Sequence, residues 1–317
     1  MEKRPIGMMP RAEGLKRLIN RLPAEHQSQS YLQKELHRTT SGARGEQRIE
    51  TRFNEFYLDE DFRVMWNVQL QLGNWPVQID GLLLTKRCAI IIESKNISGQ
   101  IHFDEQTGEF YRIDDDGLKT VMEDPQIQLR KNIRFLSVWF KKHKILLPIQ
   151  GLIVFTAKKC EFITKPTRTP ICKTYQMPEM LLKIYEALPP TAANLSLLKI
   201  KNVLLSSQTP FIEIPLCQRY FIHPGELKTG VYCRNCQLPT MFRTKRSWHC
   251  QTCHHHDLLA HEFALQEYFS LIDTTITNER FREFCGLDSR HVAGRLLSHF
   301  DLQTIGESKA RRYRLKN

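Results

Sequence analysis

The chain has 317 residues, of which 41% are hydrophobic, and its formal net charge is +12. A chain of this length can form two or three domains with a sizeable core, and its excess of positive charge favours a polyanionic partner, such as nucleic acid or an anionic membrane surface. No segment reaches the roughly 18 to 20 apolar residues that span a bilayer, and residues 1–17 lack the apolar core of a signal peptide. We therefore expect a soluble, cytoplasmic protein with no membrane partner.

Four segments are expected along the chain, and their composition sets them apart. They are a basic N-terminal arm or helix at residues 1–38, a main domain with a helical extension at 39–225, a cysteine-rich ribbon at 229–257 and a helical module at 258–317. In the second segment, Ser41 can cap a helix, because apolar residues recur at helical spacing after it.

Apolar runs in the second segment predict a sheet and a helix that packs on it. Strands are expected at residues 62–70, 77–84, 89–95 and 151–157. Before the last of these strands, Asp124 can cap a helix in which Pro125 takes the first position. Strands and helices in this order predict an α/β domain.

Two of the predicted strands carry polar residues within their apolar runs, and these are Gln78, Asp80, Glu93 and Lys95. An antiparallel hairpin that turns just after Lys86 places Asp80 opposite Glu93 and Gln78 opposite Lys95. Residues two apart on a strand share one face, and the Cβ atoms of cross-strand partners lie about 5 Å apart. The four polar groups are therefore expected to meet in one patch.

Two carboxylates that face each other repel unless a cation lies between them or one is protonated. Carboxylate oxygens suit Mg²⁺ or Mn²⁺, which positions water, lowers its pKa and neutralises charge on a phosphodiester. Lys95 is then placed to orient the water or to stabilise the developing charge, and Gln78 to hold a phosphate or a metal-bound water. The alternative is a structural cluster of buried ion pairs, although apolar packing usually stabilises a core better.

The spacing of these residues resembles that of a known group of nucleases. The letters QID, twelve residues and then ESK match the Asp…Glu-x-Lys core of the restriction-endonuclease-like, or PD-(D/E)xK, enzymes. Together with GARGEQRIE before them and EDPQIQLRKNI after them, they make roughly residues 39–160 similar to the nuclease-related domain (NERD) family. The resemblance implies a restriction-endonuclease-like mixed sheet flanked by helices, and a metal-dependent phosphodiesterase.

The resemblance also assigns roles to single residues. It maps the catalytic core to Asp80, Glu93 and Lys95, with Mg²⁺ or Mn²⁺ as cofactor. Glu46 maps to a further acid near the metal, or else is a solvated helix residue. Gln128 resembles an active-site glutamine of related nucleases, or else lies on the helix surface. The sequence ESK replaces the more usual ETK, and we expect Ser94 to point to the opposite face with little effect.

Two Cys-x-x-Cys pairs form a second motif, at Cys233, Cys236, Cys250 and Cys253. Thirteen residues separate the pairs, which is typical of a zinc ribbon whose four thiolates hold one Zn²⁺ tetrahedrally. The loop between the pairs mixes basic residues with Phe242 and Trp248, a composition that suits backbone contact and base stacking on nucleic acid. Alternatively, the two aromatic residues cover a small core.

The C-terminal segment has a helix-turn-helix pattern. Thr277 can cap its first helix, Gly286 supplies the turn, and Asp288 can cap the second helix. Residues 302–315 then predict a hairpin that turns within residues 306–309, so the order of elements resembles a winged helix. The second helix is expected to enter a major groove and the basic end to meet phosphates. The alternative is a protein-interaction module with a solvated basic tail.

These patterns predict a metal-dependent DNA nuclease whose zinc ribbon and winged-helix-like module hold the nucleic acid. A non-catalytic DNA-binding regulator that keeps the nuclease fold is the first rival, and an RNA nuclease is the second. The presence of Asp80, Glu93 and Lys95 favours the enzyme over the regulator. The helix-turn-helix pattern favours DNA over RNA, because A-form RNA hides its major groove.

Overall fold

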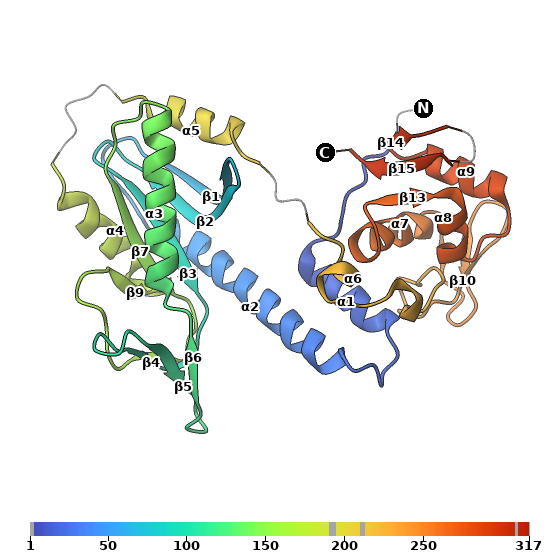
Figure 1. Ribbon diagram of the computed structural model, residues 1–317, viewed down its shortest axis with the longest axis horizontal. Helices are drawn as coiled ribbons and strands as arrows, with labels where there is room; N and C mark the ends of the chain where they lie inside the picture. Colours follow the sequence, from blue (N-terminus) through green and yellow to red (C-terminus); the bar gives the residue numbers. More distant parts are fainter. Residues whose placement is uncertain (1–2, 190–194, 210–212, 308–309, 317) are drawn as a thin grey trace. The chain divides into compact units, whose positions relative to one another are not determined.

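The structure is a computed structural model that describes residues 3–189, 195–209, 213–307 and 310–316 (Figure 1). The chain divides into two compact units. Residues 41–211 form the first, here called the sheet unit, and residues 1–40 and 212–317 together form the second, the ribbon unit. The ribbon unit is therefore assembled from two segments that are far apart in the sequence. In the described part of the chain, no helix is long and apolar enough to cross a membrane.

The core of the sheet unit is a mixed five-stranded sheet in the order β1-β2-β3-β7-β9. Its strands are β1 (Arg63–Leu72), β2 (Trp75–Leu84), β3 (Ala89–Lys95), β7 (Ile149–Phe155) and β9 (Ile171–Lys173). The first three strands pair antiparallel, whereas β3, β7 and β9 run parallel. Residues 82–84 and 90–92 are fully buried, as expected for strands that are covered on both faces.

Helices cover the two faces of this sheet. One face packs against α3 (Pro125–Lys142), which crosses the sheet in Figure 1. Asp124 caps this helix, because its side chain accepts a hydrogen bond from the main-chain N–H of Gln126. The other face packs against the C-terminal end of α2 (Gln29–Phe53) and against α4 (Met177–Glu186). The predicted α/β fold, a mixed sheet flanked by helices, is confirmed.

The helix α2 begins earlier than the sequence indicated. Ser41, which was expected to cap a helix, lies inside α2, so this prediction is wrong. The residues before Ser41 include strong helix formers, which extend the helix toward the N-terminus. The main-chain carbonyl of Ser41 also accepts a hydrogen bond from the side chain of Asn96 at 2.7 Å. This contact ties α2 to the chain just after β3.

A second, smaller sheet of the sheet unit has the order β6-β5-β4-β8. Its strands are β4 (Gly99–Phe103), β5 (Phe110–Ile113), β6 (Lys119–Met122) and β8 (Cys160–Phe162). The remaining elements are the short 3-10 helix η1 (Thr174–Gln176), which precedes α4, and α5 (Leu197–Ser206), which contacts β1.

The ribbon unit contains helices from both of its segments. They include α1 (Arg11–Arg21), α6 (Leu216–Arg219), the 3-10 helix η2 (Pro224–Glu226) and α7 (Ala260–Leu271). Leu15 and Leu18 of α1 are fully buried in one apolar cluster with Leu216 and Leu271. The N-terminal residues therefore contribute core side chains to this unit.

An ion pair also fixes α1 in the ribbon unit. Arg21 is fully buried and pairs with Glu267 of α7. Its guanidinium lies over the rings of Tyr232 and Phe284, at 4.5 and 4.3 Å from their centroids. It also donates hydrogen bonds to the carbonyls of residues 228 and 230. Because the guanidinium is surrounded by partners, its burial is compensated.

Two three-stranded sheets complete the ribbon unit. The first contains β10 (Met241–Arg243), β11 (Trp248–Cys250) and β12 (His256–Asp257) in that order. The second has the order β13-β15-β14 and contains β13 (Thr275–Thr277), β14 (Leu302–Ile305) and β15 (Arg312–Leu315). Between β13 and β14, the chain forms α8 (Asn278–Cys285) and α9 (Arg290–Ser298).

The turn between α8 and α9 follows the predicted pattern except at one cap. Thr277 caps α8 by accepting a hydrogen bond from the N–H of Arg280, and Gly286 ends it with φ 66°, a conformation that favours glycine. Ser289, not Asp288, caps α9, so that prediction is wrong by one residue. The hairpin of β14 and β15 is present, but residues 308 and 309 of its turn lie outside the described residues.

Candidate active site and zinc site

The hairpin of β2 and β3 brings the predicted polar residues to one cavity. The ladder between β2 and β3 has the register that a turn after Lys86 predicts. This ladder ends at the pair of Gly81 and Ile92. The polar residues lie just beyond this last pair. They line a cavity of about 300 Å³, and its walls include all six predicted site residues: Glu46, Gln78, Asp80, Glu93, Lys95 and Gln128.

Asp80 is anchored to β3 through its side chain. Its Oδ2 accepts hydrogen bonds from the main-chain N–H and from the hydroxyl of Ser94, both at 2.8 Å. The expectation that Ser94 points to the opposite face is therefore wrong. The ladder between β2 and β3 ends at Gly81 and Ile92, although β3 stays paired with β7 as far as Lys95. The N–H of Ser94 is therefore not used by β2 and donates to the Asp80 carboxylate instead.

The strand on the other side of Asp80 is also irregular. The ladder between β1 and β2 omits the pair of Asn67 and Asp80, and Asn67 has φ 50°. Few residues other than glycine adopt this left-handed conformation, although asparagine does so more often than most. The Asn67 side chain accepts a hydrogen bond from Nε2 of Gln78 at 2.8 Å. Asp80 thus lies at a break in both ladders of β2.

Glu93, Lys95 and Gln128 form one hydrogen-bonded chain. Nζ of Lys95 donates to Oε1 of Glu93 at 2.7 Å and to Oε1 of Gln128 at 2.8 Å. Gln128 is therefore joined to the site from the first turns of α3, rather than lying on the helix surface. Asn132, one turn further along α3, is buried and reaches Oε2 of Glu93 at 3.5 Å. Asn132 was not expected from the sequence, although its spacing of four residues from Gln128 places it on the same helix face.

The cavity holds three carboxyl groups, and the surroundings of two of them, Glu93 and Glu46, disfavour the ionised form. The pKa of Glu93 is raised to about 7, first by burial and then by the charges of Asp80 and Glu46, against the opposing effect of Lys95. The pKa of Glu46 is also raised, first by burial and then by the charges of Asp80 and Glu50. A cation in the cavity would relieve this repulsion.

The donor set fits a hard divalent cation that completes its coordination outside the protein. Among the described residues, only a group of four cysteines brings three or more His, Cys, Asp or Glu ligand atoms within 4.8 Å of one another. The carboxylates of the cavity are therefore not a closed cage. Mg²⁺ is commonly bound through one or two carboxylates plus water and substrate phosphate. Asp80 and Glu93 can supply that number of ligands.

The pKa of Glu93 predicts how the stability of the sheet unit depends on pH when Mg²⁺ and Mn²⁺ are absent. Its pKa rises from 4.5 to about 7 on folding, so the folded protein binds more protons between these values. The free energy of unfolding should then fall by about 2 to 3 kcal/mol as the pH rises through this window. Urea unfolding at about pH 5 and about pH 8 measures the change. Glu93→Gln should lose most of this pH dependence of the free energy of unfolding. If the variant kept the same pH dependence as the parent protein, the change would not come from Glu93.

The hydroxyl of Ser94 predicts a difference between two substitutions. Ser94→Ala removes a hydrogen bond to a carboxylate, so the free energy of unfolding should fall by about 1 to 2 kcal/mol. Ser94→Thr keeps the hydroxyl on a β-branched side chain that suits a strand, and it should stay within about 0.5 kcal/mol of the parent protein. Urea unfolding, followed by tryptophan fluorescence, compares the two. Equal losses would show that the hydroxyl bond contributes nothing.

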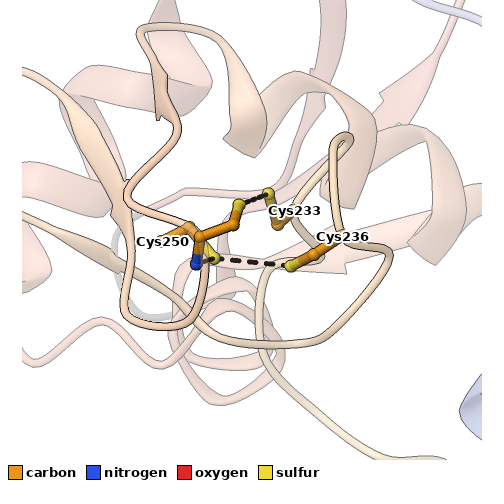
Figure 2. A group of neighbouring side chains, drawn as sticks. Cys233, Cys236 and Cys250 are labelled. Atoms are coloured by element: carbon orange, nitrogen blue, oxygen red, sulfur yellow. Dashed lines mark hydrogen bonds between the residues drawn. The ribbon is translucent and has the colours of Figure 1, made fainter.

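The ribbon unit holds a separate group of four sulfur atoms. Cys233, Cys236, Cys250 and Cys253 form the cysteine group, and none of them is in a disulfide. Figure 2 labels Cys233, Cys236 and Cys250, whose sulfur atoms point toward a common centre. The Sγ atoms of Cys233 and Cys253 are 3.6 Å apart, and those of Cys236 and Cys250 are 3.5 Å apart. Tetrahedral zinc with Zn–S bonds of about 2.3 Å requires sulfur separations of about 3.8 Å. The group therefore fits one Zn²⁺.

Polar groups around the sulfur atoms also support a zinc site. The main-chain N–H of Cys253 donates to Sγ of Cys250 at 3.4 Å, and the hydroxyl of Thr240 lies 3.2 Å from the same atom. Donors of this kind stabilise thiolates and orient them toward a metal. The structure supports a small zinc ribbon, as the spacing predicted.

The aromatic residues of the ribbon differ in exposure. Trp248 is fully buried and donates through its indole N–H to Nδ1 of His261 at 3.2 Å. It belongs to the core of the ribbon unit, so the expectation that it stacks on a base is wrong. A ribbon this small needs a large apolar side chain for its core. Phe242, by contrast, is 44% exposed beside the exposed Lys245 and Arg246.

The sheet unit is thus an α/β domain with carboxylates and a lysine in a cavity beside the end of the ladder between β2 and β3. Residues 41–156 match the family model of the nuclease-related domain (NERD). This part of the chain is therefore a nuclease-related domain, as the sequence motifs indicated. Comparisons with curated proteins and with solved structures found no match.

Proposed function

We propose that the protein is a metal-dependent nuclease that hydrolyses phosphodiester bonds of DNA. The meeting of Asp80, Glu93 and Lys95 in one cavity of a nuclease-related domain carries the proposal. Hydrolysis of a phosphodiester needs ligands for a divalent cation and a positive group that faces the developing charge. The two carboxylates and the ammonium meet these needs.

Each residue has a defined part in this scheme. Asp80 and Glu93 would hold Mg²⁺ or Mn²⁺, and the bound ion supplies Lewis-acid charge and lowers the pKa of water. Lys95 is 23% exposed and is held by Gln128, so its ammonium can reach a phosphate oxygen. Glu46 adds a third carboxylate that can accept a proton or a hydrogen bond from water, and the exposed amide of Gln78 can contact the phosphate.

The ribbon unit would supply affinity for DNA. Arg311, Arg312 and Arg314 are exposed at its C-terminal end, where they can meet phosphates. The elements β13 to β15, with the helices α8 and α9, are proposed to act as a winged-helix-like module. The four free cysteines of the zinc group favour a reducing compartment, which supports a cytoplasmic location.

Two alternative functions would use some of the same surfaces and residues. A non-catalytic DNA-binding regulator would use the same basic surfaces, but the buried Glu93 beside Asp80 would then have no function that offsets its cost. An RNA nuclease would use the same cavity, and the difference would lie in the ribbon unit. Both rivals can be separated from the proposal by measuring cleavage and binding together.

The decisive experiment incubates pure protein with linear DNA, closed circular DNA and RNA of matched length. Each substrate is tested with Mg²⁺, with Mn²⁺ and with chelator. The proposal expects DNA cleavage that requires a divalent ion. Binding of DNA without cleavage under any ion would favour the regulator, and preferential cleavage of RNA would favour the second rival.

A further inference from the structure

A second cavity of the sheet unit lies beside the carboxylate cavity and has the opposite charge. Its volume is about 610 Å³, and it is lined by α2, by the end of β7 and by the chain from β9 into η1. Here it is called the basic cavity. Its cationic residues are Arg44, Arg48, Arg52, Lys158 and Lys173.

The positive charge of the basic cavity is mostly uncompensated. Among the described residues that line it, Glu55 is the only acid, and it pairs with Arg52 at 2.6 Å. Within the described part of the chain, Arg44, Lys158 and Lys173 make no ion pair. Arg44, Arg48 and Arg52 follow one another at intervals of four residues, so they form one row along α2. Several like charges that converge in a concave site focus the potential on an anion.

The wall between the two cavities is thin. Thr156 lines the basic cavity, and its main-chain N–H donates to the carbonyl of Lys95, which lines the carboxylate cavity, at 2.9 Å. The helix α2 passes close to this point because Gly45 has no side chain, and a Cβ there would lie 2.6 Å from Oγ1 of Thr156. Glu46 of α2 faces the carboxylate cavity, whereas Arg44 and Arg48 face the basic one.

The basic cavity also offers an aromatic surface. Tyr175 of η1 lines it and is 63% exposed, although an aromatic side chain usually gains stability by burial. An exposed ring beside cations is the combination that binds a nucleic-acid strand, because the base stacks while the phosphate meets the charges. The volume exceeds what a phosphate alone needs and leaves room for a base.

From these features, we propose that the basic cavity binds one nucleotide of the substrate strand next to the bond that is cut. Arg44 and Lys173 contact its phosphate, and Tyr175 stacks on its base. Arg48 is partly committed, since it donates to the carbonyl of Thr156 at 2.8 Å. The inference rests on the proposed nuclease function, because it takes the carboxylate cavity as the place of cleavage.

Three variants of the full chain test the cavity: Arg44→Ala, Lys173→Ala and Tyr175→Ala. Lys142→Ala is the matched control, because Lys142 ends α3, is exposed and does not line the cavity. Fluorescence anisotropy with a labelled DNA oligonucleotide, single-stranded and as a duplex, measures binding without divalent ions. Each variant that loses a phosphate contact should reduce the slope of log affinity against log salt by about 1, and Lys142→Ala should not.

Cleavage adds a second readout. If the cavity positions the strand, Lys173→Ala should lower the cleavage rate by about 10- to 100-fold at saturating DNA. Single phosphates of the oligonucleotide are then replaced by neutral methylphosphonates. At one position beside the cut, this replacement should lower the cleavage rate of the parent protein by a similar factor. At that position the rate of Lys173→Ala should fall little further, because the contact between Lys173 and the phosphate is already absent.

The outcomes separate the two proposals. If the parent protein cuts DNA and the three variants bind and cut like Lys142→Ala, the cavity inference is overturned and the nuclease function stands. If the parent protein cuts nothing but Arg44→Ala and Lys173→Ala weaken binding more than the control, the cavity binds DNA and the nuclease function fails. Equal effects at every methylphosphonate position would also overturn the inference.

Discussion

Replacing Asp80 with alanine is expected to lower the rate of DNA cleavage by at least about a thousandfold, while DNA binding persists. Asp80 is one of the two carboxylates proposed to hold the divalent ion, so its loss removes both metal affinity and charge neutralisation. Binding should persist because it rests on the basic surfaces. Cleavage of linear DNA with Mg²⁺ and anisotropy without it measure the two effects.

The structural cost of this substitution should be small. Asp80→Ala leaves the N–H and hydroxyl of Ser94 without their acceptor, which costs about 1 to 3 kcal/mol. It also removes a charge that raises the pKa of Glu93 and Glu46, and this offsets part of the loss. Asp80→Asn is the sharper control, since its amide oxygen can still accept from Ser94. Activity that survives in both variants, purified in the same way, belongs to a contaminating nuclease.

Removing the metal from the cysteine group is expected to unfold the zinc ribbon and leave the sheet unit folded. Zinc binding supplies roughly 10 to 16 kcal/mol to small ribbons, which exceeds the stability of most domains. Elemental analysis should find one zinc per chain in protein purified without chelator. After metal removal, trypsin should cut at Lys245 and Arg246 much faster, whereas sites in the sheet unit should keep their protection.

Matched cysteine variants test whether the effect comes from the metal. Cys236→Ser removes one ligand and should lower both the zinc content and the protease resistance of the ribbon. Cys160→Ser replaces a buried thiol of the sheet unit, and it should leave the zinc content at one per chain. Protein that contains no zinc yet resists trypsin at the ribbon would contradict the prediction.

The sequence was most informative where one local rule decided the geometry. The turn after Lys86 predicted the register of β2 and β3, because a hairpin fixes which residues are opposite. That register placed Asp80 and Glu93 close enough to share a cavity. The proposed metal site rests on that closeness, since two neighbouring carboxylates repel unless a cation lies between them or one is protonated.

The sequence was uninformative where the local rule stopped applying. Strand alternation put Ser94 on the opposite face, but the ladder between β2 and β3 ends two residues earlier, and the Ser94 hydroxyl donates to the Asp80 carboxylate. For Trp248, the basic neighbours favoured stacking on a base, whereas the small size of the ribbon favoured a place in its core. Composition alone could not decide between the two positions. The row of arginines on α2 did not predict a cavity, because the residues that share the basic cavity with it, Lys173 and Tyr175, are far away in the sequence.

The buried pair of Arg21 and Glu267 has a consequence for the order in which the protein folds. The two residues are 246 positions apart, so Arg21 leaves the ribosome long before its partner is made. Domains generally fold as they emerge, and the whole sheet unit is synthesised between the two parts of the ribbon unit. Until α6 and α7 appear, most of the apolar partners of α1 are missing, and the guanidinium of Arg21 lacks its carboxylate partner, Glu267. The helix α1 is thus made first, but its burial is completed only after the sheet unit has been synthesised.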